Sequence, residues 1–332
     1  MPFFYRERLF RYLNKATLPT TIMTKDLVFI VSGGRTATAL FGEMLSQCVE
    51  DCVSIHEPDL INRNVKKTLN NIRNFGLWHV IFGRILNRTG ARVIGQKSIL
   101  NKISDNQVKN YIIRSRQAYF GSIAASLVVE SNGQWWALTD HLAQVWPTAR
   151  IIMIIRDPRD WIRSWINKSG RYDQYDLVEL FPPGRLTPQK VRDVTWTSQW
   201  SSFTTLEKLA WEWSYINRRL LESYERGGNK RLFRFEDIFS NNRSHLIELV
   251  NYITMFPERT YRIIDMDNLA KTVSNSSSGP MPHWKNWDAN SARSINMICG
   301  TLMKRFGYGE EEEWKKLVTK DDDEKSFSHG VS

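Results

Sequence analysis

The chain has 332 residues, of which 42% are hydrophobic, and this is enough to bury the core of one large α/β domain or two small ones. Its net charge of +11 favours anionic partners, namely nucleotides, sulfated or phosphorylated sugars and acidic membrane surfaces. The lack of a basic arm and of any RNA- or DNA-binding motif argues against a nucleic acid, and no apolar run reaches the roughly 20 residues of a membrane span.

The cysteines and histidines indicate in which cellular compartment the protein works and whether it binds a metal. Three cysteines, Cys48, Cys52 and Cys299, are too few for a disulfide framework. The six histidines are scattered, and no metal-ligand spacing occurs among them. We therefore expect a protein of a reducing compartment, the cytoplasm, that holds no metal.

Residues 1–20 carry aromatic side chains and arginines at roughly helical spacing. This pattern predicts a short amphipathic helix ahead of the domain, without the apolar core or the cleavage site of a signal peptide. We expect the helix to pack on the domain, and peripheral contact with a membrane surface stays open as a second interpretation.

The first strong pattern is a strand, a tight loop and a helix. Residues 27–31 are a continuous apolar, β-favouring run, Gly33 and Gly34 follow it, and an amphipathic helical pattern begins at Leu40. A small-residue loop that opens a helix presents free backbone N–H groups and the positive end of the helix dipole, which bind phosphate. Arg35 adds a full charge, whereas the Gly-Lys-Ser/Thr of a Walker A loop and the G-x-G-x-x-G dinucleotide fingerprint are missing.

Two more short β-favouring runs follow, each with ionisable residues at its end. Residues 52–55 predict a second strand that leads into His56 and Glu57, and residues 92–95 predict a third strand that leads into Lys97. Because α/β folds keep ligands at the carboxyl ends of their strands, we expect Glu57 and Lys97 on the same rim as the phosphate loop.

The fourth predicted strand, residues 150–155, is apolar almost throughout, as suits a strand buried on both faces of a parallel sheet. It ends at Arg156, and Pro158 begins a helix that contains Ser164. The remaining predicted elements are helices over 60–90 and 105–145, an irregular excursion over 166–195, a helix over 197–226, a strand over 231–235, a helix over 244–269, a loop over 274–282, a final helix over 291–306 and a disordered polar tail over 319–332. We expect one domain over residues 21–318.

Two of these elements resemble the phosphate-binding motifs of the sulfotransferases that use 3′-phosphoadenosine 5′-phosphosulfate (PAPS). The loop Arg35-Thr36-Ala37-Thr38-Ala39 is similar to the family's [KR]-S-G-T-T, and Arg156 to Ser164 is similar to its R-[DN]-P-R-D-x-x-x-S. The resemblance implies a P-loop-like three-layer α/β fold, with a central parallel β-sheet flanked by helices. It also implies that the first loop, with Gly33 and Gly34 before it, holds the 5′-phosphosulfate, and that Arg156 and Ser164 hold the 3′-phosphate.

Weaker matches follow in the family's order. Phe235 stands where the family places an aromatic residue near the adenine, and Trp284 and Lys285 resemble the segment that closes over the nucleotide. The chain also departs from the family at two positions. Ala37 replaces the family's glycine, which argues against a positive φ there, and Ala39 removes a hydroxyl from the sulfonate side.

The resemblance implies transfer of a sulfuryl group from PAPS to a hydroxyl or amine of an acceptor. Glu57 stands where the bacterial carbohydrate and protein-tyrosine branches place a glutamate, so we expect it to be the general base, with His56 as the neighbouring alternative. Arg35 would stabilise the leaving phosphate, and Lys97 would contact the sulfonate or orient Glu57. The positive charge and the glutamate favour a carbohydrate acceptor.

Two other classes stay open from the sequence. A P-loop-like nucleotide kinase would need a Walker lysine and Mg²⁺ ligands, which are missing from the motif. A non-catalytic polyanion-binding relic of the fold is the other class, because Ala37 and Ala39 replace functional residues of the family.

Overall fold

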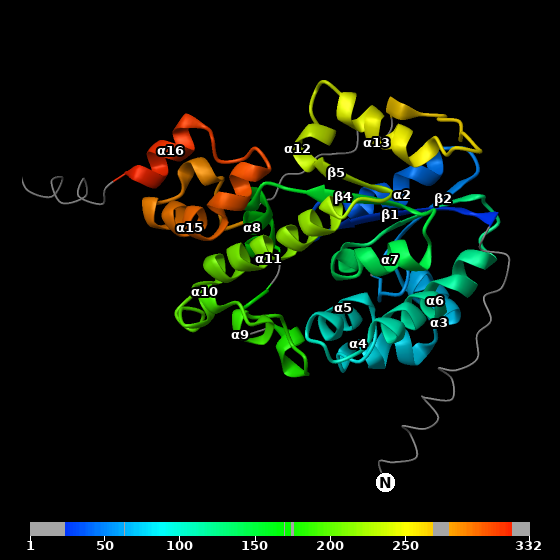
Figure 1. Cartoon of the computed structure of the whole chain (residues 1–332), viewed down its shortest axis with the longest axis horizontal. Coiled ribbons are helices and arrows are strands. Elements are labelled where there is room, and N and C mark those ends of the chain that lie inside the picture. The colour runs from blue at the N-terminus through cyan, green and yellow to red at the C-terminus, as the bar shows by residue number, and fades with distance from the viewer. Residues whose placement is uncertain (1–23, 63, 169, 174–175, 268–278, 321–332) are drawn as a thin grey trace, which may run out of the picture.

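The computed structural model describes residues 24–62, 64–168, 170–173, 176–267 and 279–320, and its centre is a parallel β-sheet. The strands are β1 (Asp26–Ser32), β2 (Cys52–His56), β3 (Leu127–Ser131), β4 (Arg150–Ile155) and β5 (Lys230–Arg234). Their order across the sheet is β2-β3-β1-β4-β5, and each neighbouring pair is parallel (Figure 1). The predicted α/β fold with a central parallel β-sheet is therefore confirmed.

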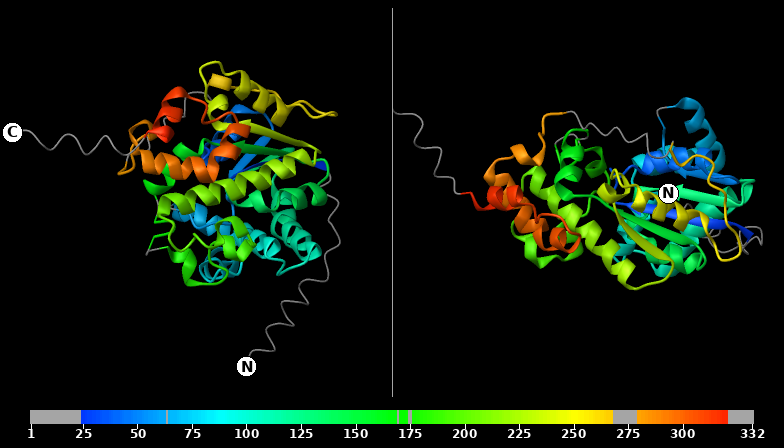
Figure 2. Two further views of the ribbon diagram at one scale, coloured as in Figure 1. Left: turned by 60° about the vertical axis from the view of Figure 1, so that its left-hand side comes forward. Right: turned by 90° about the horizontal axis from the view of Figure 1, so that it is seen from above.

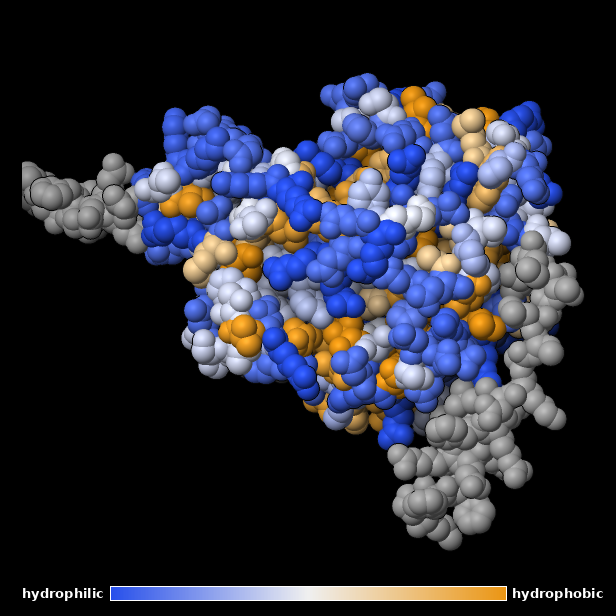
Figure 3. Space-filling model, in the orientation of Figure 1, coloured by the Kyte–Doolittle hydropathy of each residue, from blue (hydrophilic) through white to orange (hydrophobic). Residues whose placement is uncertain are grey.

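The other elements are helices and single turns. In chain order they are α2 (Thr38–Cys48), α3 (Val65–Phe75), η2 (Trp78–Phe82), α4 (Gly83–Ile85), α5 (Ala91–Ile99), α6 (Asp105–Ser122), η3 (Gly133–Ala137), α7 (Thr139–Val145), α8 (Pro158–Ile166), η4 (Leu177–Leu180), α9 (Pro188–Val191), α10 (Val194–Thr197), α11 (Thr205–Glu225), α12 (Phe235–Ile238), α13 (Ser244–Thr254), η5 (Trp284–Asn286), α15 (Ala289–Arg305) and α16 (Glu312–Thr319). None of the helices in the described ranges has the length and apolar content that crossing a membrane requires. The face shown in Figure 3 is largely hydrophilic, with its apolar residues in separate patches.

Helices cover both faces of the sheet because successive residues of its central strand are apolar and point to opposite sides. Leu27, Phe29 and Val31 of β1 pack into a core that includes residues of α6, α7, α8 and α11. Val28 and Ile30 pack into a second core with α2 and α13. Figures 1 and 2 show the resulting three layers, with the sheet between two layers of helices.

The prediction of a third strand over residues 92–95 is wrong, because these residues lie in α5. The third strand in the chain is β3, within the stretch 105–145 that the sequence analysis predicts as helical. Short apolar runs fit a buried helical turn as well as a strand, and tertiary packing decides between them. Gly95 lets α5 approach η3 closely, since a Cβ there would lie 2.7 Å from the Cβ of Ala137. Lys97 consequently lies in the last turn of a helix and not at a strand end.

Several predicted boundaries also shift. The helix predicted over 197–226 begins at Thr205, after Thr204 and Glu207 form a reciprocal capping box. The helix predicted to reach residue 269 ends at Thr254. The helix predicted over 1–20, the tail beyond residue 320 and most of the loop over 274–282 lie outside the described residues.

The carboxyl ends of the strands meet at one edge of the sheet. The register places Ser32 beside Ile154 and His56 beside Ser131. The chain leaves β1 and β4 in opposite directions, because α2 packs on one face of the sheet and α8 on the other. A crevice between such diverging loops is where open α/β sheets bind their ligands.

Gly42→Ala tests the tight packing of α2 on β2. A Cβ at Gly42 would lie 2.5 Å from the Cβ of His56 and 2.8 Å from its backbone nitrogen, so the strand has to move. We expect the free energy of unfolding, measured by urea denaturation, to fall by about 1–3 kcal/mol. The matched control is Gly121→Ala in α6, where a Cβ meets open space and the helix gains up to about 1 kcal/mol. Equal effects of the two substitutions would contradict the close contact.

Candidate active site

The loop after β1 has an unusual backbone conformation that its own side chains support. Gly34, Arg35 and Ala37 have positive φ angles of 80°, 58° and 56°. The hydroxyl of Ser32 accepts a hydrogen bond from the backbone N–H of Gly34 at 3.0 Å. It also accepts one from the hydroxyl of Thr36 at 2.6 Å. The loop is therefore a tight, internally bonded turn that leads directly into α2.

Ala37 precedes the first residue of α2, and its left-handed conformation (φ 56°, ψ 24°) contradicts the expectation that an alanine avoids a positive φ here. The conformation costs about 1–2 kcal/mol for a residue with a Cβ, and the contacts around the loop offset that cost. The methyl group of Ala37 cannot cap the helix, and the first helical turn begins with the uncharged Thr38 and Ala39. The N–H groups of this turn therefore remain available to an anion.

The second motif, after β4, touches the first directly. Nη1 of Arg156 donates to the carbonyl of Arg35 at 2.7 Å, across 121 residues of sequence. Nε of Arg35 donates to the hydroxyl of Ser164 at 2.9 Å. The guanidinium of Arg156 stacks 4.6 Å from the ring centre of Phe235, and its Nε makes no hydrogen bond to a described residue. The two predicted phosphate motifs thus form one continuous cationic surface.

These residues line a cavity of about 280 Å³, which we call the first cavity. Its lining residues are Arg35, Thr36, Ala37, Thr38, Ala39, His56, Arg156, Ser164 and Lys168. Burial and the charge of Arg156 lower the pKa of Arg35. Within the described ranges, neither arginine forms an ion pair with a carboxylate. An anion that enters the first cavity would supply the counter-charge that both lack.

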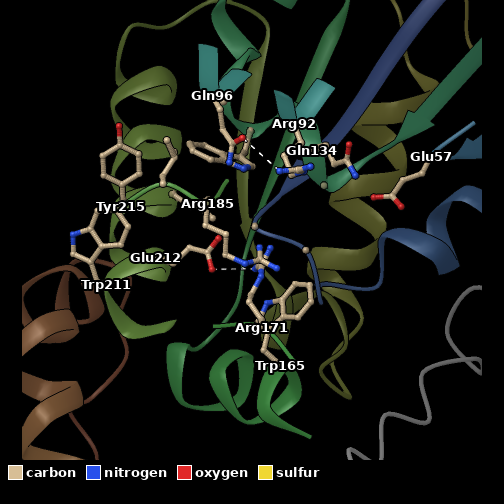
Figure 4. Close-up of a pocket in the computed structure, with 17 residues that line it drawn as sticks. Glu57, Arg92, Gln96, Gln134, Trp165, Arg171, Arg185, Trp211, Glu212 and Tyr215 are labelled. Atoms are coloured by element: carbon tan, nitrogen blue, oxygen red, sulfur yellow. Dashed lines mark hydrogen bonds and ion pairs between the residues drawn. The ribbon is translucent and has the colours of Figure 1, made fainter. Parts of the chain in front are cut away.

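A second cavity, of about 250 Å³, shares the loop after β1 as part of its wall. Gly33 and Gly34 line it, and Glu57 lies at one side of it (Figure 4). The wall is closely packed, since a Cβ on Gly133 would lie 3.2 Å from the Cα of Gly34. The side chains around this second cavity include Arg92, Gln96, Gln134, Trp136, Trp165, Arg171, Arg185, Trp211, Glu212 and Tyr215.

His56 and Glu57, at the end of β2, line different cavities. His56 lines the first cavity and Glu57 the second. Nδ1 of His56 lies 3.0 Å from the carbonyl of Ser131, and because a carbonyl only accepts hydrogen bonds, Nδ1 carries a proton. Nε2 of the same ring lies 3.7 Å from the Glu57 carboxylate. Burial raises the pKa of Glu57 despite the opposing charge of His56. A carboxylate with a raised pKa has the basicity that a general base needs.

A buried ion network lies behind the end of β2. Arg116 donates to both carboxylate oxygens of Glu130, at 2.6 and 2.9 Å, and to Asp59 at 3.3 Å. Arg84 lies 2.8 Å from Asp59 and donates to the amide oxygen of Gln134 at 3.0 Å. Burial alone would raise the pKa of Asp59, but Arg116 and Arg84 outweigh it and hold that pKa well below its usual range. The network thereby ties the turn after β2 to Gln134 in the wall of the second cavity.

Four predicted site residues do not line either cavity. Phe235 is buried beneath the second motif. Trp284 is buried against the guanidinium of Arg159, 4.2 Å from its ring centre, and Lys285 is exposed in a surface ion pair. Lys97 is half-buried on α5, so the rim position predicted for it is wrong. The roles of Phe235, Trp284 and Lys285 towards a nucleotide stay predictions.

Several cavity residues are missing from the sequence interpretation. Arg92 and Gln96 lie about one helical turn apart on α5, a spacing that has meaning only when this segment is a helix. Arg171 and Arg185 come from the predicted irregular excursion, and Lys168 follows α8. The expectation of a metal-free site stays a prediction, and the described residues hold no group of three or more His, Cys, Asp or Glu side chains placed to share a metal ion.

Comparison with known proteins finds a family model that matches part of this chain. Residues 27–180 match the sequence model of the sulfotransferase family, which confirms the resemblance to sulfotransferases. No curated relative matches the sequence of this chain. Among solved structures, the chain is similar to a crystal structure of a sulfotransferase from Alicyclobacillus acidocaldarius, with 11% sequence identity and a TM-score of 0.43, over 88% of this chain and 99% of that chain.

Ala37→Gly tests the left-handed backbone at the start of α2. Because glycine adopts a positive φ without steric cost, we expect the free energy of unfolding to stay level or to rise by up to about 1 kcal/mol. Ala39→Gly, two residues later in the first helical turn, should instead lower it by about 0.5–1 kcal/mol. Urea denaturation followed by circular dichroism measures both. A loss at Ala37 as large as the loss at Ala39 would rule out the left-handed conformation.

Proposed function

We propose that this protein transfers a sulfuryl group from PAPS to a hydroxyl or amine of an acceptor, in the cytoplasm, and that the acceptor is polyhydroxylated, as a carbohydrate is. One observation carries the proposal: a single loop separates a cationic cavity from a cavity that contains a half-buried carboxylate of raised pKa. Transfer between two substrates needs this arrangement, with the donor on one side and the base on the other.

The donor would occupy the first cavity. Arg156 and Ser164 would bind the 3′-phosphate, and Arg35 with the N–H groups at the start of α2 would bind the 5′-phosphate. Both phosphates are attached to one ribose, so the close approach of Arg35 and Arg156 suits them. Lys168 adds a further positive charge to the same wall. This arrangement would favour the bisphosphate over nucleotides with a single phosphate.

The acceptor would approach the loop from the second cavity. Its oxygen forms a new bond to sulfur while the bond between sulfur and the 5′-phosphate oxygen breaks, and the hydroxyl proton passes to the Glu57 carboxylate. Arg35 and the loop N–H groups stabilise the negative charge that grows on the departing phosphate. Nε2 of His56 lies 3.7 Å from the Glu57 carboxylate, and in the neutral imidazole it can take the proton onward from the carboxyl group.

Binding of 3′-phosphoadenosine 5′-phosphate (PAP) tests the donor site. Calorimetry should give tighter binding of PAP than of AMP or Mg-ATP, because only PAP carries the 3′-phosphate. Arg156→Ala removes a charged hydrogen bond worth about 1.5–3 kcal/mol and should weaken PAP by roughly ten- to a hundred-fold. Arg262→Ala is the control, since that arginine is 74% exposed and pairs with Glu50 before the start of β2.

Transfer itself is measured with sulfur-labelled PAPS and a panel of hydroxylated acceptors. Labelled product supports the enzyme. Tight PAP binding without transfer to any acceptor of the panel would instead favour the non-catalytic binder. Equal affinity of the Arg156→Ala variant and the unaltered protein for PAP would remove the assignment of the 3′-phosphate site.

Glu57→Gln tests the general base. We expect the rate of transfer to fall by about 10²–10⁴-fold, and the rate of the unaltered enzyme to rise with pH through the raised pKa of Glu57. A buried carboxyl with a raised pKa favours folding while it is protonated, and this contribution is lost as the pH rises above the unfolded pKa. The glutamine variant should therefore gain stability relative to the unaltered protein as the pH rises from the unfolded pKa of about 4.3 through the raised pKa of folded Glu57.

The control for this substitution is Glu43→Gln, whose carboxylate is 61% exposed on α2. It should change neither the rate nor the pH dependence of stability by a measurable amount. If the Glu57→Gln variant keeps full activity, Glu57 is not the general base, and His56 becomes the candidate.

A further inference from the structure

The second cavity is lined by the arginines Arg92, Arg171 and Arg185 and by the carboxylates of Glu57 and Glu212. Arg185 donates to both carboxylate oxygens of Asp176, and Arg171 lies 3.1 Å from Glu212. Arg92, in contrast, bonds only to the amide oxygens of Asn87 and Gln96 and forms no ion pair with a described carboxylate. Burial, followed by the charges of Arg185, Arg84 and Arg171, lowers the pKa of Arg92 to about 10. A half-buried cation that contacts no carboxylate marks a place where a ligand can supply the counter-charge.

Arg171 has unused donors in the same place. Its side chain is 14% exposed, and its guanidinium stacks 4.0 Å from the ring centre of Trp165. Although Nη1 is close to Glu212, neither Nε nor Nη1 makes a hydrogen bond to a described residue. Buried guanidinium donors without a hydrogen bond are costly, and an oxyanion is the partner whose geometry suits them.

The shape of the cavity limits what accompanies that anion. In the view of Figure 4, the guanidinium groups of Arg92, Arg171 and Arg185 lie between Glu57 on one side and Trp211 with Tyr215 on the other. Aromatic side chains in the wall present apolar faces to a ring. The volume of about 250 Å³ suits a small molecule of one or two rings.

We propose that the acceptor is a small ring compound that carries, besides the hydroxyl to be sulfated, a carboxylate or another oxyanion. The oxyanion binds Arg92 and Arg171, and this contact directs the hydroxyl towards Glu57. The inference rests on the proposed function, because it assigns the second cavity to the acceptor. A neutral analogue of the same shape leaves Arg92 half-buried with no oxyanion in contact and therefore binds more weakly.

Matched pairs of acceptors test this inference by binding alone, without turnover. Calorimetry compares 4-hydroxybenzoate with 4-hydroxybenzamide, and D-glucuronate with D-glucose, on the protein with and without saturating PAP. The charged member of at least one pair should bind roughly ten- to a hundred-fold more tightly than the neutral member. Equal affinity within both pairs, preference for the neutral members, or no binding of either charged member overturns the inference.

Variants locate the anion. Arg92→Gln should reduce the preference for the charged member to less than about threefold and leave PAP affinity unchanged, because Arg92 lines only the second cavity. The double variant Arg171→Met with Glu212→Gln removes that ion pair without leaving a buried carboxylate, and should have the same effect. The control Arg73→Gln lies on the exposed surface of α3. If both variants keep the preference for the charged acceptor, the anion binds elsewhere and the inference is overturned. Failure of PAP to bind contradicts only the donor assignment.

Discussion

The contact between Arg35 and Arg156 is the constraint on which the rest of the site depends. The guanidinium of Arg156 donates to the backbone carbonyl of Arg35, and the guanidinium of Arg35 donates to Ser164. No described carboxylate pairs with either arginine, and the charge of Arg156 lowers the pKa of Arg35. Two positively charged side chains stay this close only when other contacts hold each of them in place. Phe235 supports Arg156 and the ring of Trp165 lies 5.6 Å from Arg35, so two aromatic faces hold the pair in place. A ligand with two phosphate groups relieves this repulsion.

The second half of the site depends on the ends of β2 and β3. Hydrogen bonds across this strand pair fix the ring of His56, and the carboxylate of Asp59 fixes the turn that follows. Glu57 is left between these two anchors with a positive φ of 42°, partly buried and close to its histidine neighbour. Its basicity therefore comes from the surrounding fold and not from any residue that touches it alone.

The sequence predicts the parts of this molecule in which local pattern and tertiary packing agree. The strands β1 and β4 and the helices that follow them are predicted correctly, because a strand buried on both faces has a distinctive composition. The short runs at α5 and β3 are assigned wrongly, since two or three apolar residues fit either structure and tertiary packing, such as the approach of Gly95 to Ala137, decides. Because of that error, Lys97 is predicted at a strand end, and Arg92 is not recognised as a residue of the cavity. Arg171 lies in an irregular segment without a pattern, and only the folded chain brings it to the cavity.

The shared loop has a consequence for how the two substrates affect each other. The backbone around Gly34 belongs to both cavities, and the indole N–H of Trp161 holds its carbonyl at 2.9 Å. If a ligand in the first cavity moves Arg35, the adjoining Gly34 in the wall of the second cavity would move with it. Thermodynamic reciprocity then requires that each substrate alters the affinity for the other by the same factor, so that occupancy of one compartment is sensed in its neighbour.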